Sequence, residues 1–110
     1  MLQQTLMALA MAAAIAATAP AQAANVAAGQ AKAKEVCAAC HGADGNSATA
    51  EFPRIGGQYA DYLAKALRDY KSGQRKNPIM AGFAQALSKQ DIENLAAWYA
   101  AQPATVSAKH

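Results

Sequence analysis

Hydrophobic residues recur at helical spacing in three parts of the chain after residue 25. In the first part, about residues 26–39, Val26, Gly29, Ala33, Val36 and Cys37 share one stripe. Glycine in the middle of a helix costs about 1 kcal/mol relative to alanine. We therefore expect either a close helix crossing at Gly29 or a frayed first turn that tolerates it.

The second predicted helix covers about residues 58–72 and has the clearest division into two faces. Gly73 is a good stop for it. Charged residues occupy the outer face. The apolar stripe consists of Tyr59, Tyr62, Leu63, Ala66, Leu67 and Tyr70.

The third predicted helix begins at Ser88 and ends before Pro103. Ser88 and Asp91 resemble a capping box with Asp in place of the usual Glu. Trp98 lies at the edge of the predicted buried stripe, which consists of Ile92, Leu95, Ala96 and Tyr99.

Turn-forming residues separate these helices and predict two loops, at about residues 42–57 and 74–83. No segment alternates between apolar and polar residues as a half-buried strand would. The pattern therefore predicts an all-α domain of three main helices joined by loops.

The beginning of the chain resembles an export signal. Residues 6–19 are almost entirely apolar, and Ala21-Gln22-Ala23 follows Pro20 as a small-x-small cleavage site. Residues 1–5 lack the usual positive charge. We expect a cleaved signal peptide at residues 1–23 and one domain at residues 24–110, with a short flexible C-terminal tail. An uncleaved membrane anchor is the alternative, although the apolar run is shorter than the roughly 20 residues of a span.

The charge balance is only mildly basic, with ten Lys and Arg against seven Asp and Glu. No basic cluster with interleaved aromatic residues occurs, so the sequence gives no indication of nucleic-acid binding.

Cys37-Ala-Ala-Cys40-His41 carries the most specific chemistry, and these are the only two cysteines of the chain. Residues three apart on a helical turn point the same way, so both thiols can reach the two vinyl groups on one edge of a haem. The histidine that follows can then bind the iron. Cys-x-x-Cys-His is the signature of c-type haem attachment.

Three other interpretations of the two cysteines remain open. A thioredoxin-like dithiol would need a preceding strand and a βαβ pattern, and neither is visible. A structural zinc site usually takes four Cys or His ligands, and the only further histidine is His110. A disulfide between residues three apart would close a very small loop and add little stability.

A haem iron has a second axial position, which electron-transfer proteins commonly fill with Met or His. Met80 is the only methionine after the predicted signal peptide. We expect Met80 to lie in the loop between the second and third helices and to bind the iron. The alternatives are that Met80 only fills space in the core, or that His110 is the ligand.

Taken together, the helix, the CAACHG motif, the two later helices and the methionine resemble the class I cytochromes c over residues 25–102. The segments at 52–59 (FPRIGGQY) and 77–83 (NPIMAGF) are most similar to the small bacterial periplasmic cytochrome c-553 group, and also to single domains of di-haem periplasmic cytochromes.

The resemblance implies one covalent haem c, with thioether bonds from Cys37 and Cys40 and axial ligation by His41 and Met80. It implies that the Pro53 carbonyl accepts a hydrogen bond from the His41 ring. It also implies that the first and last helices cross at Gly29.

The function that follows is a periplasmic one-electron carrier and not an enzyme. Its expected partners are a redox protein donor and acceptor, membrane-associated oxidase or reductase complexes among them, with no nucleic acid and no small-molecule substrate. The alternatives are a haem enzyme or gas sensor with an open sixth site, and a non-haem CxxC thiol oxidoreductase. The residues that we expect along the haem or its helix contacts are Val36, Leu63, Leu67, Ile79, Phe83, Leu95 and Tyr99.

Overall fold

The computed structural model describes residues 23–104, and this part of the chain contains helices and no strand. The predicted all-α class is therefore confirmed. Residues 1–22 of the predicted signal peptide and residues 105–110, His110 included, lie outside the described residues. The helices are α1 (Val26–Val36), α2 (Ala38–His41), α3 (Ala60–Ser72), α4 (Pro78–Gln85) and α5 (Lys89–Ala100).

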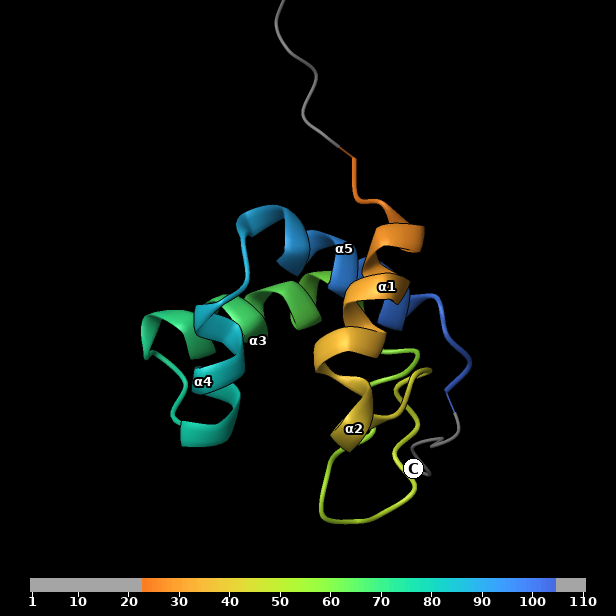
Figure 1. Ribbon diagram of the computed structural model, residues 1–110, viewed down its shortest axis with the longest axis horizontal. Helices are drawn as coiled ribbons and strands as arrows, with labels where there is room; N and C mark the ends of the chain where they lie inside the picture. Colours follow the sequence, from red (N-terminus) through yellow and green to blue (C-terminus); the bar gives the residue numbers. More distant parts are fainter. Residues whose placement is uncertain (1–22, 105–110) are drawn as a thin grey trace, which may run out of the picture.

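The first and last helices, α1 and α5, cross each other (Figure 1), and Gly29 lies at the crossing. A Cβ atom on Gly29 would lie 2.0 Å from the backbone oxygen of Asn94 and 3.0 Å from the Cβ of Trp98. Asn25 caps α1, and its backbone N–H donates to the Asn94 side-chain oxygen at 2.8 Å. The close crossing explains the glycine, and a frayed first turn is not needed.

The first predicted helix is divided in two, because α1 ends at Val36 and α2 is a separate short helix. Cys37 lies between them with φ −112° and ψ −31°, away from the usual helical values of about −63° and −42°. Gly42, with φ 86°, ends α2. The cysteine motif therefore occupies a turn of its own at the end of α1.

The prediction of a loop at residues 74–83 is wrong in its second half, because α4 begins at Pro78. Met80 consequently lies in the first turn of a helix. The Asn77 side chain accepts hydrogen bonds from the backbone N–H groups of Ile79 and Met80. Asparagine at the N-cap followed by proline at the first position favours a helix start. The same two residue types also favour turns, which is why the sequence pattern predicts a loop here.

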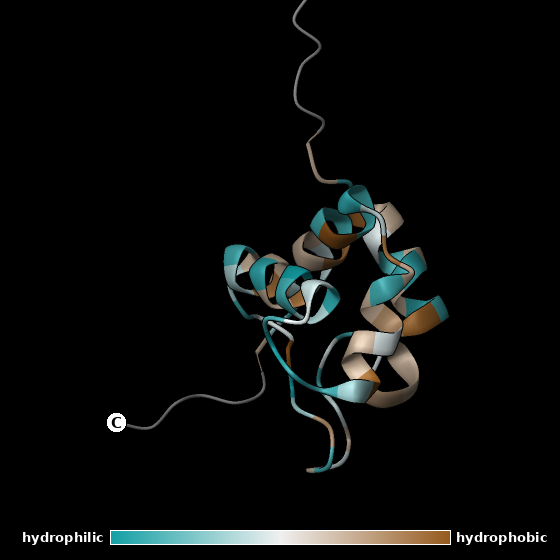
Figure 2. Cartoon of the chain, turned by 90° about the vertical axis from the view of Figure 1, so that its left-hand side faces the viewer, coloured by the Kyte–Doolittle hydropathy of each residue, from teal (hydrophilic) through white to brown (hydrophobic). Residues whose placement is uncertain are grey.

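The core lies where α1, α3 and α5 meet, and the predicted stripe of α5 is buried there in full. The stripe of α3 is only partly buried, since Leu63 is buried but Tyr59 is 81% exposed and Tyr62 is 50% exposed. Figure 2 shows hydrophilic and hydrophobic residues alternating along the helical ribbons. The core residues are Ala33, Leu63, Ala64, Leu87, Ile92, Leu95, Ala96 and Tyr99.

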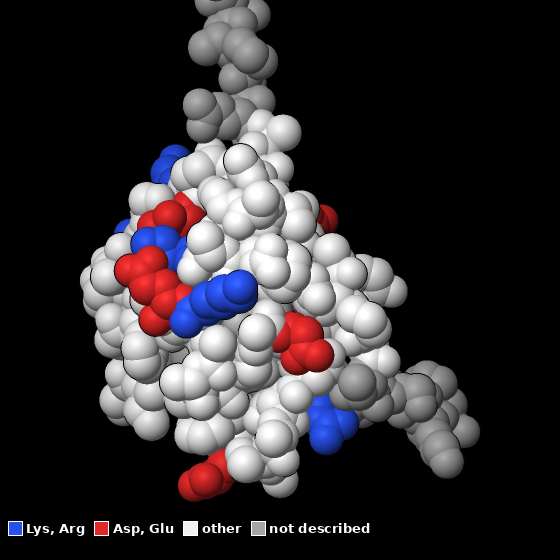
Figure 3. Space-filling view, turned by 45° about the vertical axis from the view of Figure 1, so that its right-hand side comes forward, with Lys and Arg blue, Asp and Glu red and all other residues white. Residues whose placement is uncertain are grey.

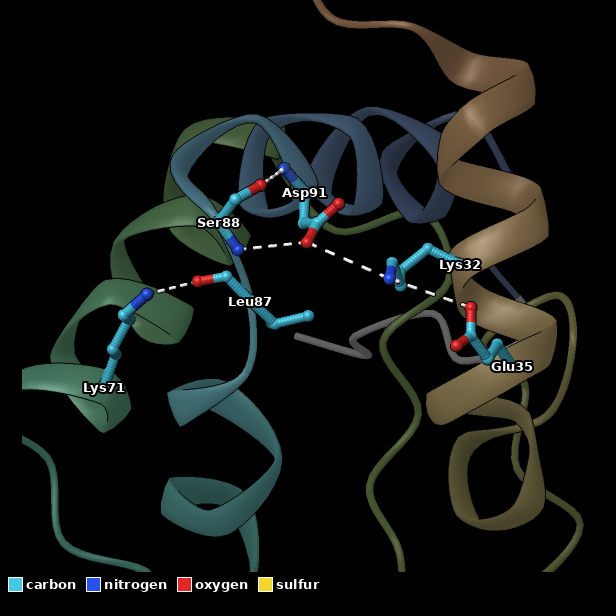
Figure 4. A network of polar contacts seen from close by, with 6 residues as sticks. All are labelled: Lys32, Glu35, Lys71, Leu87, Ser88 and Asp91. Atoms are coloured by element: carbon cyan, nitrogen blue, oxygen red, sulfur yellow. Dashed lines mark hydrogen bonds and ion pairs between the residues drawn. The ribbon is translucent and has the colours of Figure 1, made fainter.

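The beginning of α5 is held by the predicted capping box, which is confirmed. The Ser88 hydroxyl accepts from the Asp91 N–H, and the Asp91 carboxylate accepts from the Ser88 N–H, each at 3.0 Å. The same carboxylate lies 3.9 Å from the ammonium of Lys32 on α1 (Figure 4). These contacts connect the start of α5 to α1 as well as capping the helix.

Charged side chains of both signs lie beside one another on the face seen in Figure 3, and much of that face is uncharged. Lys65 pairs with Asp69 along α3, and Arg68 of α3 pairs with Glu93 of α5 at 3.0 Å. Among residues 23–104 we find no helix long and apolar enough to cross a membrane.

Candidate functional site

A cavity of about 380 Å³ lies between α2, the loop before α3, and the helices α3, α4 and α5. Cys37, Cys40, His41 and Met80 all line it, although Met80 lies in a segment about 40 residues further along the chain. The structure therefore brings the four predicted site residues to one cavity. Pro53, the fifth, also lines it.

His41 is the last residue of α2 and is only 8% exposed. Its Nδ1 lies 2.8 Å from the carbonyl oxygen of Pro53. Because a carbonyl oxygen can only accept, we assign the proton to Nδ1, which leaves the lone pair on Nε2. This is the tautomer that a metal-binding histidine uses when a carbonyl group holds its other nitrogen.

The loop between α2 and α3 sets the position of Pro53. It folds back on itself at Gly45, whose carbonyl oxygen accepts from the N–H groups of Ile55 at 2.7 Å and Gly56 at 3.0 Å. The N–H of Gly57 donates to the Tyr99 carbonyl at 2.8 Å, which joins the loop to α5. Gly45 has φ 79°, and a Cβ there would lie 2.6 Å from the nitrogen of Gly56. The loop is thus a fixed wall of the cavity.

The two cysteine side chains are half-buried free thiols. Burial raises the pKa of Cys37 to about 11, and a hydrogen bond with Tyr99 offsets only part of that shift. The thiol therefore stays protonated near neutral pH. Thiol–disulfide oxidoreductases need the opposite, a cysteine pKa lowered toward neutrality. The environment of Cys37 does not favour the dithiol interpretation.

Most of the remaining wall of the cavity is apolar and includes all seven residues predicted to line the haem or its helix contacts. Ile79 and Phe83 of α4 are also substantially exposed, at 62% and 46%, so they form an apolar rim. Such a wall can enclose a flat apolar group and keep water from it. Among the described residues, no group of three or more His, Cys, Asp or Glu side chains could hold a metal ion.

Sequence reasoning missed the polar part of the wall near α4. Arg75 lines the cavity, donates to the Tyr62 hydroxyl at 3.2 Å, and lies 4.9 Å from the centre of the Tyr70 ring. The helical spacing of the two tyrosines was visible in the sequence. The position of Arg75 over them depends on how the chain turns after Gly73, which no local pattern indicates.

The sequence is similar to that of several known proteins. The family model described as "Cytochrome c" matches residues 26–100. Cytochrome c4 of Pseudomonas aeruginosa is 49% identical over 82 residues, which cover 74% of this chain and 40% of that protein. A thiosulfate dehydrogenase electron acceptor of Stutzerimonas stutzeri is 49% identical over 69 residues, covering 62% of this chain and 32% of that protein.

The fold of the chain is also similar to that of a protein of known structure. The reduced recombinant cytochrome c4 from Pseudomonas stutzeri superposes with a TM-score of 0.71 at 42% identity, covering 76% of this chain and 48% of that one. The chain spans about two fifths of the length of the cytochrome c4 relatives that it matches.

Proposed function

Because the chain belongs to the cytochrome c family, we propose that it carries single electrons between redox proteins of the periplasm by means of one covalently bound haem c. The observation that supports this most strongly is the arrangement of His41. Its ring lines the cavity together with both cysteines and Met80, while the Pro53 carbonyl holds Nδ1 at 2.8 Å. Nε2 is thereby left as the nitrogen that can bind iron.

The residues present fit a haem. Cys37 and Cys40 would form the two thioether bonds, and His41 and Met80 would be the axial ligands. The apolar side chains of α3, α4 and α5 along the cavity suit the faces of a porphyrin. When bound, the haem supplies an iron that alternates between Fe(II) and Fe(III) with no bond made or broken.

The chain's own residues would then do three things. The Pro53 carbonyl orients His41 and increases the electron density on its ring. Met80, as a thioether, favours the reduced iron and a high reduction potential. The buried Leu63, Leu95 and Tyr99 exclude water from the inner part of the cavity, while the exposed rim leaves one edge near solvent for a partner.

The partners belong to the same proposal. One relative is named as the electron acceptor of a thiosulfate dehydrogenase, and on this basis we infer that a dehydrogenase is the donor. A membrane-associated oxidase or reductase complex is the proposed acceptor. In a direct test, the reduced protein is mixed with native membranes and oxidation is followed at the haem absorption bands. Failure of these membranes to oxidise it would contradict a respiratory acceptor.

Haem attachment is tested on protein matured in a bacterium that makes c-type cytochromes. The purified protein should show a haem spectrum, and the haem should stay with the polypeptide in a denaturing gel and after acid-acetone extraction. The double variant Cys37→Ala with Cys40→Ala is the control and should retain no haem in the gel. Haem that extracts freely from the unaltered protein would contradict covalent attachment.

A further inference from the structure

The helix that carries Met80 has few partners within the fold. Of the helices described, α4 packs mainly against α3, whereas α1, α3 and α5 form the core (Figure 1). Within α4 only Ala84 is buried. Burial of one methyl group contributes little to holding a helix in place. The position of Met80 therefore depends strongly on the polar contacts that connect α4 to α3.

One set of contacts fastens the C-terminal end of α4. The Gln85 side-chain amide donates to the Lys71 carbonyl at 2.7 Å, and the Lys71 ammonium donates to the carbonyl of Leu87. Figure 4 shows Lys71 reaching from α3 to the segment between α4 and α5. Both contacts use carbonyl groups at or beyond the ends of helices, which lack partners within their own helix.

A second set fastens the segment that leads into α4. The Arg75 backbone N–H donates to the Asp69 carbonyl at 3.0 Å, and its guanidinium donates to the Tyr62 hydroxyl at 3.2 Å. The guanidinium also lies over the Tyr70 ring at 4.9 Å, within the range of a cation–π contact. Arg75 thus joins the start of α4 to two tyrosines of α3.

We propose that Arg75 and Gln85 are positioning residues that keep Met80 on the iron, one at each end of α4. This inference rests on the proposed function, in which Met80 is an axial ligand. Loss of either contact allows α4 to move away from α3 more often. The sixth position is then open for a larger fraction of the time, and an added ligand can enter faster.

The test uses the ferric holoprotein and imidazole as the added ligand. Arg75→Gln removes the charged fork, and Gln85→Leu removes the amide donor with little change in size. Each variant should increase the association rate of imidazole about fivefold, the factor that corresponds to one lost hydrogen bond. The near-infrared band of the sulfur–iron bond should weaken in parallel.

Matched controls exist among residues that do not line the cavity and whose side chains pair outside α4. Arg68→Gln removes the guanidinium that pairs with Glu93 of α5, and Gln102→Leu removes an amide that donates to the Trp98 carbonyl at 2.9 Å. Both should leave the rate and the band unchanged. Equal rate increases in all four variants would mean a general loss of stability and would overturn the inference, as would no increase in Arg75→Gln and Gln85→Leu.

Met80→Ala separates this inference from the proposed function. If its band and imidazole rate equal those of the unaltered protein, Met80 is not the ligand, and the positioning role fails together with the assignment of Met80 in the proposed function. Electron transfer by a covalent haem is then still tested by the gel and membrane experiments. If Met80→Ala removes the band while Arg75→Gln and Gln85→Leu have no effect, only the positioning role fails.

Discussion

His41 and Met80 reach the cavity from different kinds of local structure. His41 ends the short helix α2 and is held through its ring by Pro53. Met80 lies in the first turn of α4, where its backbone N–H donates to the Asn77 side chain at 3.1 Å. The histidine is fixed directly by a hydrogen bond to its ring, whereas the methionine is fixed only through its backbone and its helix.

Met80→Ala should lower the reduction potential and remove the near-infrared band, because a thioether ligand favours Fe(II). We expect a decrease of about 0.1–0.3 V, part of the roughly 0.8 V that axial ligands span. Protein-film voltammetry and the ferric absorption spectrum measure the two effects. Ile79→Ala is the control, since Ile79 lines the same cavity without a ligand atom. An unchanged potential in Met80→Ala would assign the sixth position to another residue.

At the scale of single residues, most of the residues of the candidate site could be identified from the sequence. The spacing of Cys37, Cys40 and His41 was informative because covalent attachment fixes three residue types at set offsets. Met80 was identified by elimination among methionines, and its role as a ligand stays a prediction. Arg75 could not be identified, because its contacts depend on a turn in the chain and on tyrosines that are distant in the sequence.

The helices meet most closely where α1 crosses α5. A Cβ on Gly29 would overlap the backbone of Asn94, which cannot move aside as a flexible side chain could. Gly82 in α4 is the contrasting case, because a Cβ there would meet no atom within 4 Å. The two glycines occupy helices, and only one of them is required by packing.

Gly29→Ala should therefore destabilise the protein, and Gly82→Ala should stabilise it. Forced packing costs about 1–3 kcal/mol, which outweighs the roughly 1 kcal/mol that alanine gains in helix propensity. The net loss at Gly29 is therefore up to about 2 kcal/mol, and the gain at Gly82 is about 0.5–1 kcal/mol. Urea unfolding of the haem-loaded protein gives both values. A stabilised Gly29→Ala variant would contradict the close crossing.

The capping box gives α5 a dependence on pH. The hydrogen bond from the Ser88 backbone, with a smaller effect of Lys32, lowers the pKa of Asp91 below its usual value. A carboxyl group with a lowered pKa in the folded state contributes stability above its unfolded pKa of about 3.9, and this is lost as the pH falls through the folded pKa.

At pH 7 the Asp91→Asn variant should accordingly unfold at a lower urea concentration than the unaltered protein. Its free energy of unfolding should be lower by about 0.5 kcal/mol. Once the pH is below the folded pKa of Asp91, the two proteins should have the same midpoint, because the native side chain is then also uncharged. A difference that persists unchanged at low pH would show that the charge of Asp91 plays no part.

At the scale of elements, the three long helices could be predicted because each buries a stripe that repeats at helical spacing. The division between α1 and α2 could not, since it depends on the backbone of Cys37 alone. The start of α4 had a signal in Asn77 and Pro78, but the same pair also begins turns. Tyr62 and Tyr70, which line the cavity, show that an apolar stripe does not distinguish a core face from the wall of a cavity.

For the molecule as a whole, the core consists of few residues. Three of its eight residues are alanines, and Leu95 is the largest side chain that is fully buried. A chain of this size buries a modest share of its surface and has little stability to spare. A haem attached in the cavity would add apolar contact to α3, α4 and α5 at once.

The variant Cys37→Ala with Cys40→Ala, exported without haem, should therefore show little helical circular dichroism and rapid proteolysis. A covalent ligand that contacts only the native state stabilises that state and cannot be diluted away. The haem-loaded parent protein is the reference for both measurements. A cooperatively unfolding, protease-resistant apo form would show that the helices suffice without haem.

The crossing of α1 and α5 also means that α1 cannot complete its packing until the end of the chain has emerged. Asn25 and Asn94 are 69 residues apart, yet the hydrogen bond between them joins the two helices. Closing so long a loop costs entropy before any contact rewards it, which slows folding. The cysteines at 37 and 40 emerge well before α5 exists. During that interval α1 cannot yet pack against α5. The attachment site at Cys37 and Cys40 is then still accessible to haem.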